Sequence, residues 1–159
     1  MRDRFKLFEC TVTPCALYAG GTWNTTVKME HKLITIQRRM IRWTVSVPQG
    51  TAESWPDFIQ RATHRSEELA SKYGAEDWAS IQKTQKWRLA GKAAMSTDGR
   101  WTKRFLEWKP WFRTLPHRDV GRPLKRWDDD LTHLIGGGWP EAALDGAVWQ
   151  ALGETFAAS

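Results

Sequence analysis

Three consecutive carboxylates, Asp128, Asp129 and Asp130, are the residues of this 159-residue sequence whose spacing most directly suggests chemistry. Carboxylates bind Mg²⁺, so one interpretation of this group is the metal site of a polymerase or nuclease. Neighbouring residues of a helix, however, point about 100° apart, and three of them do not converge on one ion unaided. We favour the alternative that the aspartates begin a helix, whose dipole stabilises each by roughly 0.3–1 kcal/mol.

The remaining metal-binding residue types do not cluster. The two cysteines have C-x4-C spacing with no second pair, and the histidines are scattered singly: Cys10, Cys15, His31, His64, His117 and His133. A zinc site needs four grouped ligands, so we expect neither a metal nor another cofactor. The basic N-terminus lacks an apolar signal core, and no apolar run reaches 18 residues. We therefore expect no membrane association and an intracellular location, cytoplasmic or nuclear.

The charge of the chain reverses at the aspartates. Residues 81–126 carry 13 Lys and Arg against three carboxylates, a net of +10, whereas residues 127–159 carry six carboxylates and no Lys or Arg. The overall charge of +6 therefore describes a basic block joined to an acidic end. A net of +10 requires an anionic neighbour, for which nucleic acid and the protein's own acidic tail are both candidates.

Helical periodicity is clearest over residues 27–45. Apolar side chains recur there at intervals of four, three, four and three, which predicts a buried seam: Met29, Leu33, Ile36, Met40 and Trp43. Four cations, Lys28, Lys32, Arg39 and Arg42, follow one flank of that seam. They are either a solvated helix face or a stripe that follows phosphates, and the helix alone favours neither interpretation.

Further helices are expected at residues 5–12, 54–73 (with Ser54 as the N-cap), 78–95, 127–135 and from Trp139 onward. Between residues 100 and 126, aromatic residues alternate with cations and prolines, a pattern that can stack bases or build a small core. No strand-like alternation occurs. The sequence predicts an all-α fold of about six helices with a Trp-rich, loop-containing basic segment, divided into regions 1–75, 76–126 and 127–159.

Five ordered segments resemble the C-terminal part of the reverse transcriptases of non-LTR (LINE-type) retrotransposons. Residues 17–23, LYAGGTW, are similar to a segment that follows the polymerase palm, and residues 37–43, QRRMIRW, to a QRRMLRW helix. Residues 86–91, KWRLAG, resemble RW.W.GH, and Gly121-Arg122-Pro123 with Arg126-Trp127-Asp128-Asp129 resembles GRP..RW.DD. Residues 143–149 resemble the closing A.DR..W. The resemblance, from the first segment to the last, extends over nearly the whole chain.

The resemblance implies a thumb-like helical region at 1–75 and a C-terminal extension that grip template–primer without performing the chemistry. The polymerase palm would lie upstream of Met1 and would be a partner, as would RNA and DNA bound without sequence preference. Lys92, Met95 and Gly146 replace residues typical of the family, which indicates a partly decayed copy. We expect no enzymatic activity from the chain on its own.

The leading hypothesis is therefore a nucleic-acid-binding fragment of an RNA-directed DNA polymerase. The first alternative is a helical interaction or scaffold domain whose basic block docks its own acidic tail. The second is an independent nuclease that uses the three aspartates. Under the leading hypothesis, the residues expected to contact nucleic acid are Lys28, Lys32, Arg39, Arg42, Lys86, Arg88, Arg100, Lys103, Arg104, Arg113, Arg122, Lys125 and Arg126.

Overall fold

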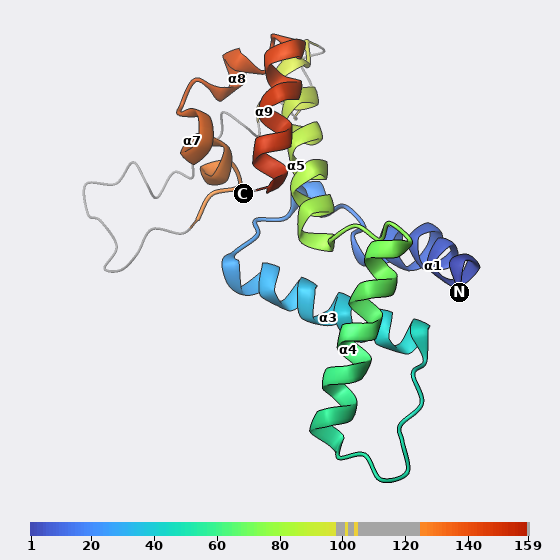
Figure 1. Ribbon diagram of the computed structural model, residues 1–159. Helices are drawn as coiled ribbons and strands as arrows, with labels where there is room; N and C mark the ends of the chain where they lie inside the picture. Colours follow the sequence, from blue (N-terminus) through green and yellow to red (C-terminus); the bar gives the residue numbers. More distant parts are fainter. Residues whose placement is uncertain (98–100, 102–103, 105–124, 159) are drawn as a thin grey trace, which may run out of the picture. The chain divides into compact units, whose positions relative to one another are not determined.

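The computed structural model describes residues 1–97, 101, 104 and 125–158 (Figure 1). Helices account for its regular structure and no strand occurs in these residues, so the all-α expectation is confirmed. The elements are α1 (Arg2–Leu7), η1 (Phe8–Val12), α2 (Thr13–Ala16), η2 (Gly20–Thr22), α3 (Val27–Val45), α4 (Trp55–Lys72), α5 (Trp78–Met95), α7 (Asp129–Ile135), α8 (Trp139–Ala142) and α9 (Gly146–Ala158). None of the described helices combines the length and the apolar character needed to cross a bilayer.

The chain forms two compact units. The first consists of Met1–Gly20 and Thr25–Gln82, and the second of Gly21–Asn24 and Lys83–Ser159. The sequence suggested divisions after residues 75 and 126, whereas in the structure the division falls after the first turn of α5. The second unit also includes four residues from early in the chain.

The long helices begin and end where their sequences predict. Thr26 caps α3 by accepting a hydrogen bond from the backbone N–H of Met29 at 3.3 Å, and Ser54 caps α4 through that of Asp57 at 3.4 Å. Such side chains satisfy donors that a first helical turn leaves unpaired. Gly74 follows α4 with a φ of 70°, a conformation that glycine adopts without a steric penalty.

The side of α3 that is buried differs from the sequence prediction. Ile41 and Val45 are buried, together with Gln37, whereas Met29, Ile36 and Trp43 are 39%, 46% and 70% exposed. The prediction of a buried Met29–Trp43 seam is therefore wrong for these three residues. Helix α3 packs against α4, and this contact turns the line through Gln37, Ile41 and Val45 toward the interior.

Gln37 explains part of this rotation, because its amide joins α3 to the start of α5. Its Nε2 donates to the carbonyl of Glu76 at 2.7 Å, and its Oε1 accepts from the backbone N–H of Trp78 at 3.0 Å. The Trp78 indole is also buried, stacked on Phe8 and hydrogen-bonded to Thr13 Oγ1. A glutamine at this position is buried because both ends of its amide are satisfied.

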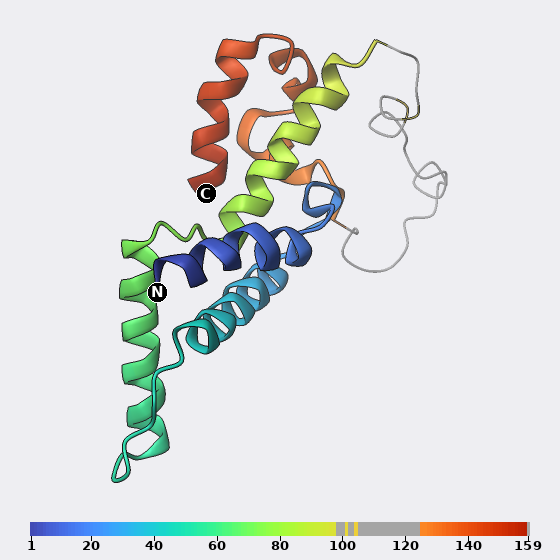
Figure 2. The ribbon, with the colours of Figure 1, turned by 90° about the vertical axis from the view of Figure 1, so that its right-hand side faces the viewer.

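The core of the second unit is built around three buried tryptophans. Trp87 of α5 stacks on Trp149 of α9 with ring centroids 3.9 Å apart, and Trp139, Leu131 and Phe156 complete the cluster. The two helices lie side by side in both views (Figures 1 and 2). Glycines permit this close approach: a Cβ on Gly91 would lie 2.6 Å from Trp149 Nε1, and one on Gly153 would lie 2.8 Å from Trp87 Nε1. Two of the five sequence motifs, residues 86–91 and 143–149, thus contribute to this packing.

Candidate nucleic-acid interface

The first group of candidate residues lies on the solvent-facing side of α3. Lys28, Lys32 and Arg39 are exposed and lie within about 40° of one another around the helix. None of the three forms an ion pair with any residue that the structure describes. These three charges are therefore uncompensated within the described part of the chain.

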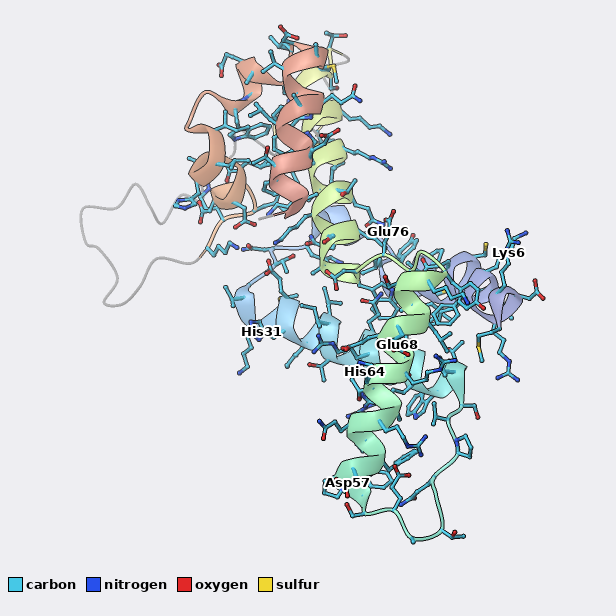
Figure 3. The ribbon with its side chains drawn as sticks, in the orientation of Figure 1. Lys6, His31, Asp57, His64, Glu68 and Glu76 are labelled. Atoms are coloured by element: carbon cyan, nitrogen blue, oxygen red, sulfur yellow. The ribbon has the colours of Figure 1, made fainter. Side chains whose placement is uncertain are left out.

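The other two arginines of α3 bind α4. Arg42 is half-buried, and its Nη1 donates to Thr63 Oγ1 at 3.1 Å. Arg38, on a different side of α3, pairs with Glu67 Oε1 at 3.1 Å. Both contacts hold α3 against α4, the two helices that His31, His64 and Glu68 mark in Figure 3. Arg42 therefore has a structural role besides any contact with a ligand.

Exposed apolar side chains lie next to Lys28, Lys32 and Arg39. Met29, Ile36 and Trp43 follow one edge of the basic stripe, so cationic and apolar groups share one face. We call this set the α3 face: Lys28, Met29, Lys32, Ile36, Arg39 and Trp43. It contains no carboxylate, and at 1.5 Å per residue it extends for roughly 22 Å along the helix.

In the second unit, Lys86 does not reach solvent. Its side chain is 1% exposed, its Nζ lies 2.6 Å from Asp130 Oδ2, and the Trp127 ring centroid is 5.4 Å away. Burial lowers the pKa of Lys86, and the hydrogen bond to Asp130 opposes that shift. We therefore leave Lys86 out of the interface, because its ammonium group is enclosed and already paired.

The three adjacent aspartates have separate partners. Asp130 also pairs with Lys125, Asp128 lies 3.6 Å from Arg126 Nε, and Asp129 accepts the backbone N–H of Arg126 at 2.6 Å. Burial by itself would raise the pKa of Asp130, but hydrogen bonds from Lys125 and Lys86 lower it below its usual value. Asp130 is thus more than the solvated helix-start residue that the sequence suggested. In the described ranges, no group of three or more His, Cys, Asp or Glu side chains is arranged to hold a metal ion.

The remaining candidates are dispersed. Arg88 is exposed on α5, and Arg104 lies with its guanidinium 5.5 Å from the Trp101 ring centroid. Lys125 and Arg126 contact the aspartates. Four further predicted contacts lie outside the described residues: Arg100, Lys103, Arg113 and Arg122.

Sequence reasoning missed Trp43 as a surface residue by assigning it to the core. At 100° per residue, Trp43 is only about 40° from Arg39, so its place beside the cations could have been recognised. It also missed Gly21, whose carbonyl accepts the Trp127 indole N–H at 2.9 Å. A Cβ on Gly21 would lie 2.9 Å from the carbonyl oxygen of Gln85, so α5 packs directly against this backbone. The glycine pair in the LYAGGTW segment was the available signal.

Comparison with known proteins gives one relative of interest and no match to a family model or a solved structure. The chain is 28% identical over 136 residues to a Caenorhabditis elegans protein described as uncharacterized and transposon-derived. The alignment covers 83% of this chain but only 44% of the relative, so the chain spans less than half of that protein's length. This similarity indicates a transposon-related origin for the chain.

Proposed function

We propose that this chain is the nucleic-acid-binding, non-catalytic C-terminal part of a transposon-derived reverse transcriptase. The α3 face contacts phosphates of RNA or DNA, including template–primer, without reading base sequence. A polymerase palm elsewhere in a longer protein performs the chemistry. The transposon-derived relative and the ordered resemblance of five segments support this assignment, and the charges on α3 support the binding role.

The observation that carries the proposal is the set of cations at Lys28, Lys32 and Arg39, which have no ion-pair partner among the residues that the structure describes. The opposite side of the same helix is held by Gln37 and by packing against α4, so the cations are presented on a supported element. Each phosphate that a cation neutralises releases condensed counterions, which favours binding at low salt. Because these residues contact phosphates, we expect all sequences to bind alike.

The alternative of a scaffold with a self-docking acidic tail is favoured by the contacts of the second unit. Lys86, Lys125 and Arg126 lie against Asp128 and Asp130, so the tail neutralises part of the basic block. The residues of the α3 face take no part in these ion pairs. The two hypotheses therefore predict binding through different residues.

The decisive experiment measures binding of fluorescent RNA and DNA across a range of salt concentrations. Replacing Lys28, Lys32 and Arg39 with Gln should weaken the binding of all RNA and DNA sequences to the same extent. The slope of log K against log salt should flatten by ~2.1 for single strands and ~2.7 for B-DNA, from ~0.7 and ~0.9 per contact. The matched control is Arg38→Gln, which removes a cation of the same helix that already pairs with Glu67.

Loss of binding in the triple variant with an unchanged Arg38→Gln variant would support the α3 face. An unchanged triple variant, or a wild-type chain that binds no nucleic acid at low salt, would overturn the proposal. The non-catalytic role is tested separately with Asp129→Asn, which should leave binding nearly unchanged. Metal-dependent cleavage or extension that disappears in this variant would contradict that role.

A further inference from the structure

We propose that Trp43 is a stacking platform for an unpaired base, so that the α3 face prefers single-stranded nucleotides over a closed duplex. This inference rests on the proposed nucleic-acid-binding function and specifies which form of nucleic acid the face binds. The indole of Trp43 is 70% exposed at the C-terminal end of that face. Tryptophan is large and apolar, so such exposure places a broad ring surface in water.

The neighbours of Trp43 favour a nucleic acid as the occupant. Arg39 precedes it by four residues and therefore occupies the adjacent position on the helix surface. Lys32 and Lys28 continue the cationic line away from the indole, in a direction that a phosphate backbone can follow. Single-strand-binding surfaces combine these two elements: a cationic path for the backbone and aromatic rings on which bases stack.

A protein partner fits the α3 face less well. The buried centre of a protein–protein interface is depleted in lysine and other charged residues, yet Lys28, Lys32 and Arg39 alternate with the apolar side chains here. Covering Met29, Ile36 and Trp43 with protein would bury these cations without a carboxylate from the same face to pair with them. The phosphates of a nucleic-acid strand supply a negative charge for each of these cations.

A duplex cannot use the indole in the same manner. Its bases are already stacked and paired, and their ring faces are inaccessible unless a step is opened at a cost of a few kcal/mol. A single strand presents unstacked bases. The contribution of Trp43 should therefore appear only with unpaired nucleotides, whereas the contribution of the cations should appear with both forms.

The test measures fluorescence anisotropy of three labelled ligands with the full chain. They are a single strand of about 12 nucleotides, an abasic strand with the same number of phosphates, and a blunt duplex. Trp43→Ala should weaken binding of the normal strand by about 5- to 150-fold, the equivalent of the 1–3 kcal/mol typical of one stacked base. Binding of the abasic strand and the duplex should change by less than about twofold, since neither offers a free base to the ring.

Two further variants complete the design. Trp43→Phe should recover most of the affinity, because phenylalanine also provides a ring face. The matched control is Trp55→Ala on α4, since Trp55 is 63% exposed but lies beside Phe58 and outside the α3 face. Circular dichroism of each variant checks that the helices are retained.

Three results would overturn the inference: no loss with Trp43→Ala, an equal loss for all three ligands, or the same loss from Trp55→Ala. Each of these leaves the proposed function intact if the Lys28, Lys32 and Arg39 variant still flattens the salt dependence. If the wild-type chain binds none of the three ligands, the proposed function itself fails.

Discussion

Removing the carboxylate of Asp130 should destabilise the second unit more than any other change in the aspartate triplet. Lys86 is 1% exposed and its ammonium group lies 2.6 Å from Asp130 Oδ2. Breaking a fully buried ion pair on one side costs about 3–5 kcal/mol, because a charge is left without its partner. Asp130 is 30% exposed and asparagine keeps an acceptor oxygen, so we expect Asp130→Asn to cost about 2–3 kcal/mol.

The neighbouring Asp129 provides the matched control. Its carboxylate is exposed and accepts one backbone N–H, a role that asparagine also performs, so Asp129→Asn should cost less than about 0.5 kcal/mol. Lys86→Met should also cost less than Asp130→Asn, because Asp130 then keeps Lys125 as a partner. Urea unfolding followed by tryptophan fluorescence measures each free energy of unfolding, provided that the slopes agree. Equal losses in the two Asp→Asn variants would refute the reasoning.

The dependence on pH gives an independent check. Hydrogen bonds from Lys125 and Lys86 lower the pKa of Asp130 below the usual 3.8, in spite of the opposing effect of burial. The stabilisation by ionised Asp130 is therefore present above pH 3.8 and is lost as the pH falls through the lower folded-state pKa. The difference between wild type and Asp130→Asn should shrink over that acidic range. A difference that stays constant would mean that charge is not its cause.

Three further outcomes are expected from urea unfolding of single variants. Burial raises the pKa of the Glu9 carboxyl above 4.5, so the contribution of protonated Glu9 to stability is fully present below pH 4.5 and is lost as the pH rises through the folded-state pKa. Glu9→Gln should therefore raise the free energy of unfolding at pH 7, and no gain at that pH would contradict this reasoning. Gly91→Ala should cost about 1–2 kcal/mol, since overpacking exceeds the gain in helix propensity, whereas Gly146→Ala, with open space around it, should be neutral or stabilising. Ile41 is 7% exposed, so Ile41→Asp should lower the free energy of unfolding by more than about 3 kcal/mol, whereas Ile36 is 46% exposed and Ile36→Asp should lower it by less than about 1 kcal/mol. Similar losses of stability in the two variants would mean that both sides of α3 are covered.

The sequence was sufficient to locate the long helices, because caps and periodicity are local properties. The structure confirms α3 over 27–45 and α5 over 78–95, and it gives α4 bounds within a residue of those expected. The sequence was not sufficient to decide which side of α3 is buried. The apolar pattern favoured Met29 and Trp43, but the partner helix and the two hydrogen bonds of Gln37 select another side. Such contacts join residues about 40 positions apart and leave no local pattern.

The candidate site was only partly predictable for the same reason. The stripe through Lys28, Lys32 and Arg39 follows from helical spacing alone, whereas the burial of Lys86 depends on a carboxylate 44 residues away. Deletion of residues 127–159 would be the simplest test of whether the acidic tail shields the basic block. The structure makes that deletion uninformative, because it would also remove Trp139 and Trp149 from the core. Single charge substitutions are the appropriate replacement.

The four residues of Gly21–Asn24 have a consequence for any attempt to divide this protein into pieces. They belong to the second unit, where the Gly21 carbonyl accepts the Trp127 indole and Asn24 donates to the Lys125 carbonyl. A peptide that starts at residue 83 would leave that indole without its acceptor and would expose the side of α5 that packs on Gly21. During synthesis, these residues leave the ribosome some sixty positions before the rest of their unit. A fragment that starts at residue 83 should therefore regain the native stability of the second unit only when a peptide carrying residues 21–24 is added to it.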